Sequence, residues 1–163
     1  MEKDRKLILT AVVLFVVLCI HGPSAWAAAG TPVKVVKDFT KAYFMLDPSM
    51  AGYLSQDALM NEDSVDMVDL YLGMKSVEAR DRGYRIDFLK KLPIDIKTKV
   101  LNVDDSSAKI QVNATTIRNI NPLFRIVGYV FGLLWEYEAQ DVITLVKENG
   151  EWKIGPGAFD MPL

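Results

Sequence analysis

The segment Asp141-Val-Ile-Thr-Leu-Val-Lys-Glu-Asn-Gly-Glu-Trp-Lys-Ile154 decides the fold of this chain. Two short runs rich in apolar and β-branched residues flank Asn149-Gly150. A two-residue type I′ turn needs positive φ at both central residues, and Asn and Gly tolerate that conformation best. The segment therefore predicts a β-hairpin whose strands are joined at Asn149-Gly150.

Two stretches upstream of the hairpin alternate between apolar and polar residues. Ile94 to Val100 and Ala108 to Thr116 both show the period of two that is typical of a half-buried strand. Asp104 to Ser107 lies between them and has the composition of a turn. With the run from Glu136 to Lys147 and the return strand Glu151 to Ile154, they predict four or more mainly antiparallel strands.

The first half of the chain has helical spacing instead. Thr31 is a capping residue before Pro32, and apolar residues then recur every three or four positions as far as Leu46. Asp47-Pro48 ends this helix, and a third helix is predicted from Ser64. Its inward-facing residues are expected to be Val65, Val68, Leu72 and either Met74 or Val77. Helices followed by antiparallel strands predict an α+β fold, with the N-terminal helices packed on one face of a curved sheet.

The N-terminus has the layout of a secretory signal peptide. Three basic residues precede the uncharged run Leu7 to Ile20, and Ala25-Trp26-Ala27 supplies the small residues of a cleavage site. We therefore expect residues 1–27 to be a signal peptide and residues 28–163 to form one exported domain, periplasmic or extracellular. If uncleaved, the same run would be a membrane anchor, but it is shorter than the roughly 20 residues that a spanning helix needs.

The chain has one cysteine and one histidine, Cys19 and His21, and both lie in the predicted signal peptide. A mature chain without thiol or imidazole excludes disulfides, Cys or His nucleophile pairs, Ser-His-Asp triads and the usual zinc sites. We therefore expect no metal and no cofactor. The mature part is weakly acidic and has no basic cluster in its sequence, so nucleic acid is not an expected partner.

Three features together resemble one known superfamily. They are an aromatic-rich helix within residues 34–47, a short helix at Tyr53-Leu54-Ser55, and final strands that end in Asn-Gly-Glu-Trp-Lys-Ile. Over about residues 32–156 the chain resembles the nuclear transport factor two-like superfamily, also called SnoaL-like or cystatin-like. The resemblance implies a cone of sheet around the first helix with a cavity at its open end. Members include enzymes, ligand-binding modules and dimerising domains, so the fold does not decide the function.

The segment Leu123 to Trp135 holds a single charge in 13 residues and departs from the superfamily pattern, which has a plain hairpin there. Three interpretations are open: the segment packs over the sheet or closes the cavity, forms a dimer interface, or makes weak contact with a membrane surface. The spacing of Gly128 and Gly132 is that of a close helix-packing motif. The expected contacts for a small apolar ligand or a partner are Tyr43, Phe124, Tyr129, Phe131 and Trp135.

Asp141 interrupts an otherwise apolar strand face that contains Tyr137, Ala139, Ile143 and Leu145. If that face lines a cavity, burial would raise the pKa of Asp141 and make it a candidate general acid or base beside a tyrosine hydroxyl. Alternatively, Asp141 is solvent-exposed or pairs with a basic residue on a neighbouring strand.

The sequence favours an exported, non-catalytic module, because the mature chain has no histidine or cysteine and carries the apolar segment. Such a module would bind a small molecule in an apolar cavity or assemble with protein, either as a homodimer or with an envelope protein. One alternative is a cofactor-free hydratase, dehydratase or isomerase that uses Asp141. Another is a membrane-anchored accessory subunit of an envelope complex.

Overall fold

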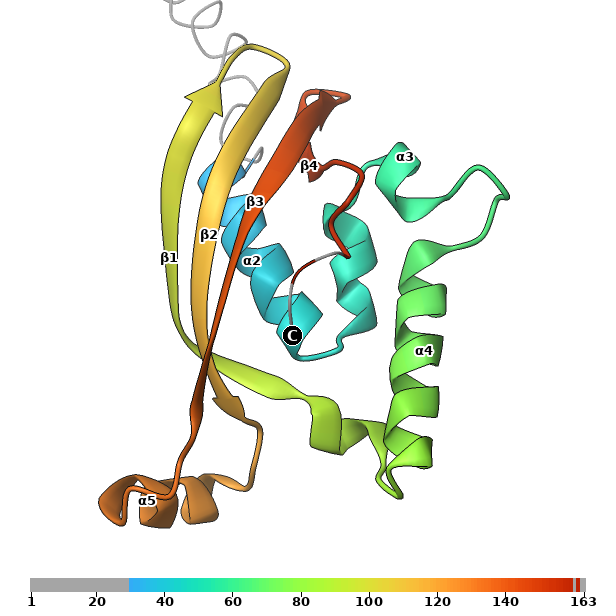
Figure 1. Ribbon diagram of the computed structural model, residues 1–163. Helices are drawn as coiled ribbons and strands as arrows, with labels where there is room; N and C mark the ends of the chain where they lie inside the picture. The colour runs from blue at the N-terminus through green and yellow to red at the C-terminus, as the bar shows by residue number, and fades with distance from the viewer. Residues whose placement is uncertain (1–29, 160, 162–163) are drawn as a thin grey trace, which may run out of the picture.

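The computed structural model describes residues 30–159 and 161, so the predicted signal peptide lies outside the described residues (Figure 1). In this part of the chain no helix combines the length and the apolar character needed to cross a membrane.

The helical layer comes first in the chain. It consists of α2 (Pro32–Phe44), η1 (Pro48–Tyr53), α3 (Gln56–Leu59), α4 (Met67–Asp81) and η2 (Ile86–Leu89). The Thr31 side chain caps α2 by accepting a hydrogen bond from the Lys34 backbone N–H at 3.2 Å. The predicted cap and first-turn proline of this helix are therefore confirmed.

Helix α4 begins three residues later than the sequence predicts. The helix is capped by Asp66 and not by Ser64. The Asp66 carboxylate accepts hydrogen bonds from the backbone N–H groups of Val68 (2.8 Å) and Asp69 (3.1 Å). Val68 and Tyr71 are buried and Leu72 packs against the core, whereas the other predicted inward residues are exposed. The prediction is thus wrong for Val65, Met74 and Val77, because α4 touches the core along a narrow stripe.

Four antiparallel strands follow in the order β1 (Lys91–Val103), β2 (Ser107–Arg118), β3 (Glu136–Glu148) and β4 (Glu151–Ile154). The short helix α5 (Pro122–Val130) is inserted between β2 and β3. Asn149 and Gly150 have φ angles of 52° and 84°, as a type I′ turn requires. The predicted hairpin at this position is confirmed.

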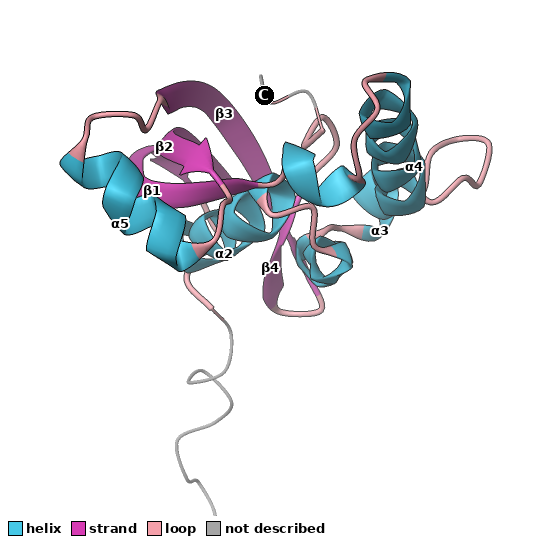
Figure 2. Cartoon of the chain, turned by 90° about the horizontal axis from the view of Figure 1, so that it is seen from below, coloured by secondary structure: helices cyan, strands magenta, loops and turns pink. Residues whose placement is uncertain are grey.

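The sheet curves around α2, and the core lies between them (Figures 1 and 2). Alternate residues of β2 and β3 point inward, and Ile110, Val112 and Leu145 are fully buried against Phe39 and Phe44 of α2. Each large apolar side chain buried in this way contributes about 1.5–3 kcal/mol. The predicted α+β class, with N-terminal helices packed on a curved antiparallel sheet, is confirmed.

Candidate functional site

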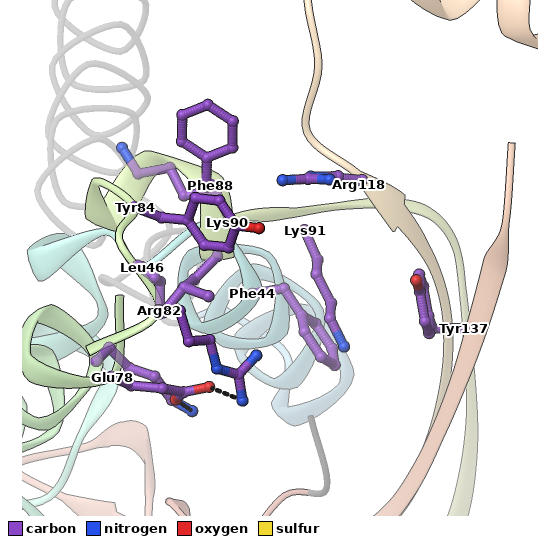
Figure 3. A pocket seen from close by; sticks show the side chains of 12 residues that line it. Phe44, Leu46, Glu78, Arg82, Tyr84, Phe88, Lys90, Lys91, Arg118 and Tyr137 are labelled. Carbon is purple, nitrogen blue, oxygen red and sulfur yellow. Dashed lines mark hydrogen bonds and ion pairs between the residues drawn. The ribbon is translucent and has the colours of Figure 1, made fainter. Parts of the chain in front are cut away.

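A partly open pocket of about 390 Å³ lies where the lower ends of β1, β2 and β3 face α4 and η2 (Figure 3). We call it the cationic pocket, because its charged lining residues are Lys75, Glu78, Arg82, Lys90, Lys91 and Arg118. The uncharged lining residues are Phe44, Leu46, Tyr84, Phe88, Leu89 and Tyr137. Five cationic side chains therefore surround the space with one carboxylate, and the pocket is not the apolar cavity that the sequence leads one to expect.

The sheet supplies two of the cations as a directly opposed pair. Lys91 is the first residue of β1, Arg118 is the last residue of β2, and the two are cross-strand partners. Like charges directly opposite each other destabilise a sheet. Folding alone gives no reason to place them together, but a site for a negatively charged group does.

Aromatic rings lie beside both of these cations. The Lys91 ammonium is 4.7 Å from the centroid of the Tyr137 ring, and the Arg118 guanidinium carbon is 5.3 Å from that of Phe88. Tyr84 stacks on Phe88 with ring centroids 5.5 Å apart. Such cation–π contacts hold a positive charge in place without neutralising it. Within the described residues neither Lys91 nor Arg118 forms an ion pair, so both charges remain available.

Helix α4 contributes the only carboxylate in the lining. Glu78 pairs with Lys75 at 2.8 Å and with Arg82 at 3.0 Å, and Figure 3 shows the contact with Arg82. The hydrogen bond from Lys75 is the main cause that lowers the pKa of Glu78 below its ordinary value. Glu78 is therefore ionised near neutral pH and partly neutralises this side of the pocket.

Burial lowers the pKa of Lys91 below that of an ordinary lysine, and the nearby Lys75 acts in the same direction. Glu78 opposes both effects. The electrostatic attraction between an ammonium and a bound anion is stronger when the ammonium is desolvated and lies beside other cations than when it is in open solvent. Lys91 is thus the cation best placed to hold a negative group.

Little in the sequence predicts this pocket. Its charged residues come from α4 and the residue after it, from the junction of η2 and β1, and from the end of β2, so they are dispersed along the chain. The one usable signal is that Lys91 and Arg118 stand at opposite ends of two adjacent strands joined by a turn. That placement identifies them as partners only when the register is known.

One predicted site residue, Tyr43, lies close to the cationic pocket but outside its lining. Tyr43 is buried in the core, and its hydroxyl donates to the carbonyl oxygen of Met161 at 3.1 Å. Its ring stacks on Tyr71 with centroids 5.0 Å apart, and burial is the main cause that raises the pKa of Tyr71. Both rings line an adjacent hollow that shares Lys75 and Glu78 with the cationic pocket.

Asp141 shares a face of β3 with Ile143 and Leu145, as predicted, and lies opposite Val112 of β2. It is only partly buried, and its carboxylate accepts a hydrogen bond from the Val142 backbone N–H at 2.7 Å. It is not among the residues that line the cationic pocket, whereas Tyr137, four residues away on the same face, is. An acid–base role for Asp141 stays a prediction.

The remaining predicted contacts belong to α5 and the turn after it. Phe124, Tyr129, Phe131 and Trp135 are all exposed, and none of them lines the cationic pocket. Figure 1 shows α5 standing off the lower end of the sheet, and Figure 2 shows α4 on the other side of the molecule. No residue from Leu123 to Trp135 lines the cationic pocket, so this segment does not close it.

The two glycines of this segment serve local packing and turning. Gly128 is buried against Leu134, and an added Cβ would lie 2.9 Å from the Leu134 Cδ2 atom. Gly132 has a φ of 64° and lets the chain turn back after α5. Their spacing is explained by this compact turn, without a second helix.

Among residues 30–159 and 161, no group of three or more Asp, Glu, His or Cys side chains could hold a metal ion. The donors gathered in the cationic pocket are ammonium and guanidinium groups, which bind anions.

No protein-family model matches the chain, and no curated protein matches it. Several solved structures match the chain. A protein from Xanthomonas campestris described as a putative calcium/calmodulin-dependent protein kinase II association domain is 17% identical, with a TM-score of 0.42, over 80% of this chain and 87% of that one. A putative scytalone dehydratase from Novosphingobium aromaticivorans DSM 12444 is 14% identical, with a TM-score of 0.39, over 74% of each chain.

A third structure is an NTF-2 like protein of unknown function from Shewanella oneidensis MR-1. It is 12% identical, with a TM-score of 0.39, over 75% of this chain and 89% of that one. Of these three neighbours, the one from Shewanella oneidensis is described as NTF-2 like. At TM-scores below 0.5 these likenesses say nothing about the ligand or activity of this chain.

Proposed function

We propose that the protein is a small-molecule-binding module whose cationic pocket holds an anionic ligand with an aromatic or apolar body. The observation that carries this proposal is the opposed pair Lys91 and Arg118, two cations without an ion-pair partner among the described residues. A carboxylate, sulfonate or phosphate group placed between them would gain charge-assisted hydrogen bonds.

The rest of the lining fits the body of such a ligand. Phe44, Tyr84 and Phe88 give the pocket apolar and aromatic walls, and Tyr137 adds another ring beside Lys91. The volume of about 390 Å³ lies within the range of roughly 300–1,000 Å³ that is usual for small-ligand pockets. One or two aromatic rings with a single anionic group would occupy it.

The test is a calorimetric titration with 2-naphthoate and with its uncharged counterpart 2-naphthamide. Naphthoate should bind and naphthamide should bind at least about tenfold more weakly, because hydrogen bonds to charged groups contribute about 1.5–3 kcal/mol each. Replacing Lys91→Met and Arg118→Met together should weaken naphthoate binding by a similar factor and leave naphthamide unaffected.

The matched control is Lys97→Met. Lys97 is also on β1, but it is exposed, pairs with Asp95 at 3.0 Å and lies outside the cationic pocket. Its loss should leave the affinity for naphthoate unchanged. The proposal is wrong if acid and amide bind equally well, or if the Lys91→Met, Arg118→Met variant melts normally and binds naphthoate as the unchanged protein does.

A further inference from the structure

Helix α5 and the turn after it expose an unusually large apolar surface. Nine large apolar side chains between Leu123 and Trp135 are 44–82% exposed, and Tyr129 and Trp135 are the most exposed of them. We call this surface the α5 patch; its members are Leu123, Phe124, Ile126, Val127, Tyr129, Val130, Phe131, Leu133 and Trp135.

The size of the α5 patch matches one side of a stable protein interface. An aromatic side chain buries about 150–250 Å², so the four exposed aromatic residues alone offer on the order of 500 Å². The five aliphatic side chains add to this area, and the largest apolar patch on a typical monomer is about 300–600 Å². A standard interface buries about 800 Å² on each partner.

The solvent-facing side of α5 is free of charge. Leu123, Val127 and Val130 share that side, whereas Arg125 and Gly128 face the body of the protein. The centre of a protein interface is typically depleted of charged residues and enriched in aromatic ones. The composition of the α5 patch therefore fits burial against protein.

The α5 patch has both projecting side chains and a recess beside them. Beside its projecting side chains lies a hollow of about 620 Å³ with a mainly apolar lining, which includes Ile94, Ile117, Ile126 and Leu134 together with Arg125 and Glu136. In a two-fold symmetric dimer the same surface must serve on both subunits, so projections and a recess have to coexist on it. The hollow shares Ile126 and Tyr129 with the α5 patch, so a projecting ring such as Phe131 of the second copy has a mainly apolar recess beside the same surface.

A membrane surface fits the same segment less well. Helices that lie on membranes usually carry several Lys or Arg residues on their polar side, which are attracted to anionic lipids. From Asn119 to Glu138 the only basic residue is Arg125, while Glu136 and Glu138 are acidic. The Arg125 guanidinium is partly buried, and its Nη2 donates to the carbonyl oxygen of Ile120 at 3.2 Å.

We propose that the α5 patch is the interface through which a second copy of this chain binds, in a two-fold symmetric dimer. This proposal is independent of the anion site, because no residue of the α5 patch lines the cationic pocket.

The experiment measures the mass of the purified protein in solution by light scattering over a range of concentrations. The unchanged protein should have twice the mass of one chain. The variant with Phe131→Ser and Trp135→Ser should have the mass of one chain and the same circular dichroism spectrum, because both side chains are exposed in the monomer. The matched control is Met74→Ser with Val77→Ser, which removes two exposed apolar side chains from α4 and should leave the doubled mass intact.

Sedimentation of the protein with vesicles of phosphatidylglycerol or of phosphatidylcholine tests whether the α5 patch binds a lipid surface instead of a second copy of the chain. The proposal is overturned if the unchanged protein has the mass of one chain at every concentration, whether or not it sediments with vesicles. It is also overturned if the doubled mass survives in the Phe131→Ser, Trp135→Ser variant, or is lost equally in the α4 control.

Discussion

The Lys91 ammonium lies 4.7 Å from the centroid of the Tyr137 ring, although the two residues belong to β1 and β3 and are separated by the whole of β2. Both residues line the cationic pocket. Burial is the main cause that lowers the pKa of Lys91.

The first prediction concerns the pH dependence of anion binding. Because the pKa of Lys91 is lowered, this side chain loses its proton at a lower pH than an ordinary lysine. Only the protonated form attracts an anion, so naphthoate affinity should fall as the pH rises into the alkaline range. In the Lys91→Met variant this fall should begin at higher pH. Calorimetric titrations at neutral and alkaline pH check the difference, and identical profiles for both proteins would contradict the role of Lys91.

The second prediction concerns the single carboxylate of the pocket. Glu78→Gln removes a negative charge that pairs with Lys75 and Arg82, so naphthoate should bind more tightly. The gain should be on the order of 1 kcal/mol, about fivefold, for a charge several ångströms away in a partly solvated site. Asp81→Asn neutralises a carboxylate on the same helix outside the pocket lining and should change the affinity little. Equal effects of the two substitutions would argue against a localised anion site.

The third prediction concerns the turn that follows α5. Gly132 has a positive φ of 64°, a conformation that costs a residue with a Cβ roughly 1–2 kcal/mol. Gly132→Ala should therefore speed hydrogen exchange of the backbone amides in residues 127–133 by about fivefold or more, as local opening becomes easier. Gly52→Ala is the control, because Gly52 lacks a positive φ and has open space where the Cβ would lie. Unchanged exchange around α5 in Gly132→Ala would contradict the assigned turn.

The fourth prediction concerns the attachment of the C-terminal segment. The Tyr43 hydroxyl donates to the carbonyl oxygen of Met161 at 3.1 Å and lies 3.5 Å from that of Phe159. Tyr43→Phe should lower the free energy of unfolding by about 1 kcal/mol, the usual contribution of one such hydrogen bond. Urea denaturation measures this change. Tyr53→Phe, where the hydroxyl has no hydrogen bond among the described residues, should be neutral, and a neutral Tyr43→Phe would contradict the attachment.

Much of the fold follows from short-range signals. The Asn149-Gly150 turn, the Thr31 cap with Pro32, and the alternation in Ala108 to Thr116 each involve residues within a few positions of one another. The start of α4 is predicted less well, since Ser64 and Asp66 are both capable caps and only the final backbone path selects Asp66.

The candidate site depends on contacts between distant segments. Lys75 on α4, Lys91 on β1 and Arg118 on β2 converge because strand register and helix packing bring them together. No local pattern marks these residues, since each is an ordinary charged residue in its own segment. The cationic pocket is lined by five cations, two of them from the ends of β1 and β2.

The sequence by itself determined the class of fold, the hairpin at Asn149-Gly150 and the unusual character of Leu123 to Trp135, because turn chemistry, periodicity and composition are local properties. Only the tertiary structure decided that α5 stands off the sheet with its apolar side exposed, and that Lys91 and Arg118 are opposed at a pocket. Both depend on strand register and on the packing of segments far apart in the chain, which fix where a side chain lies after its local conformation is set.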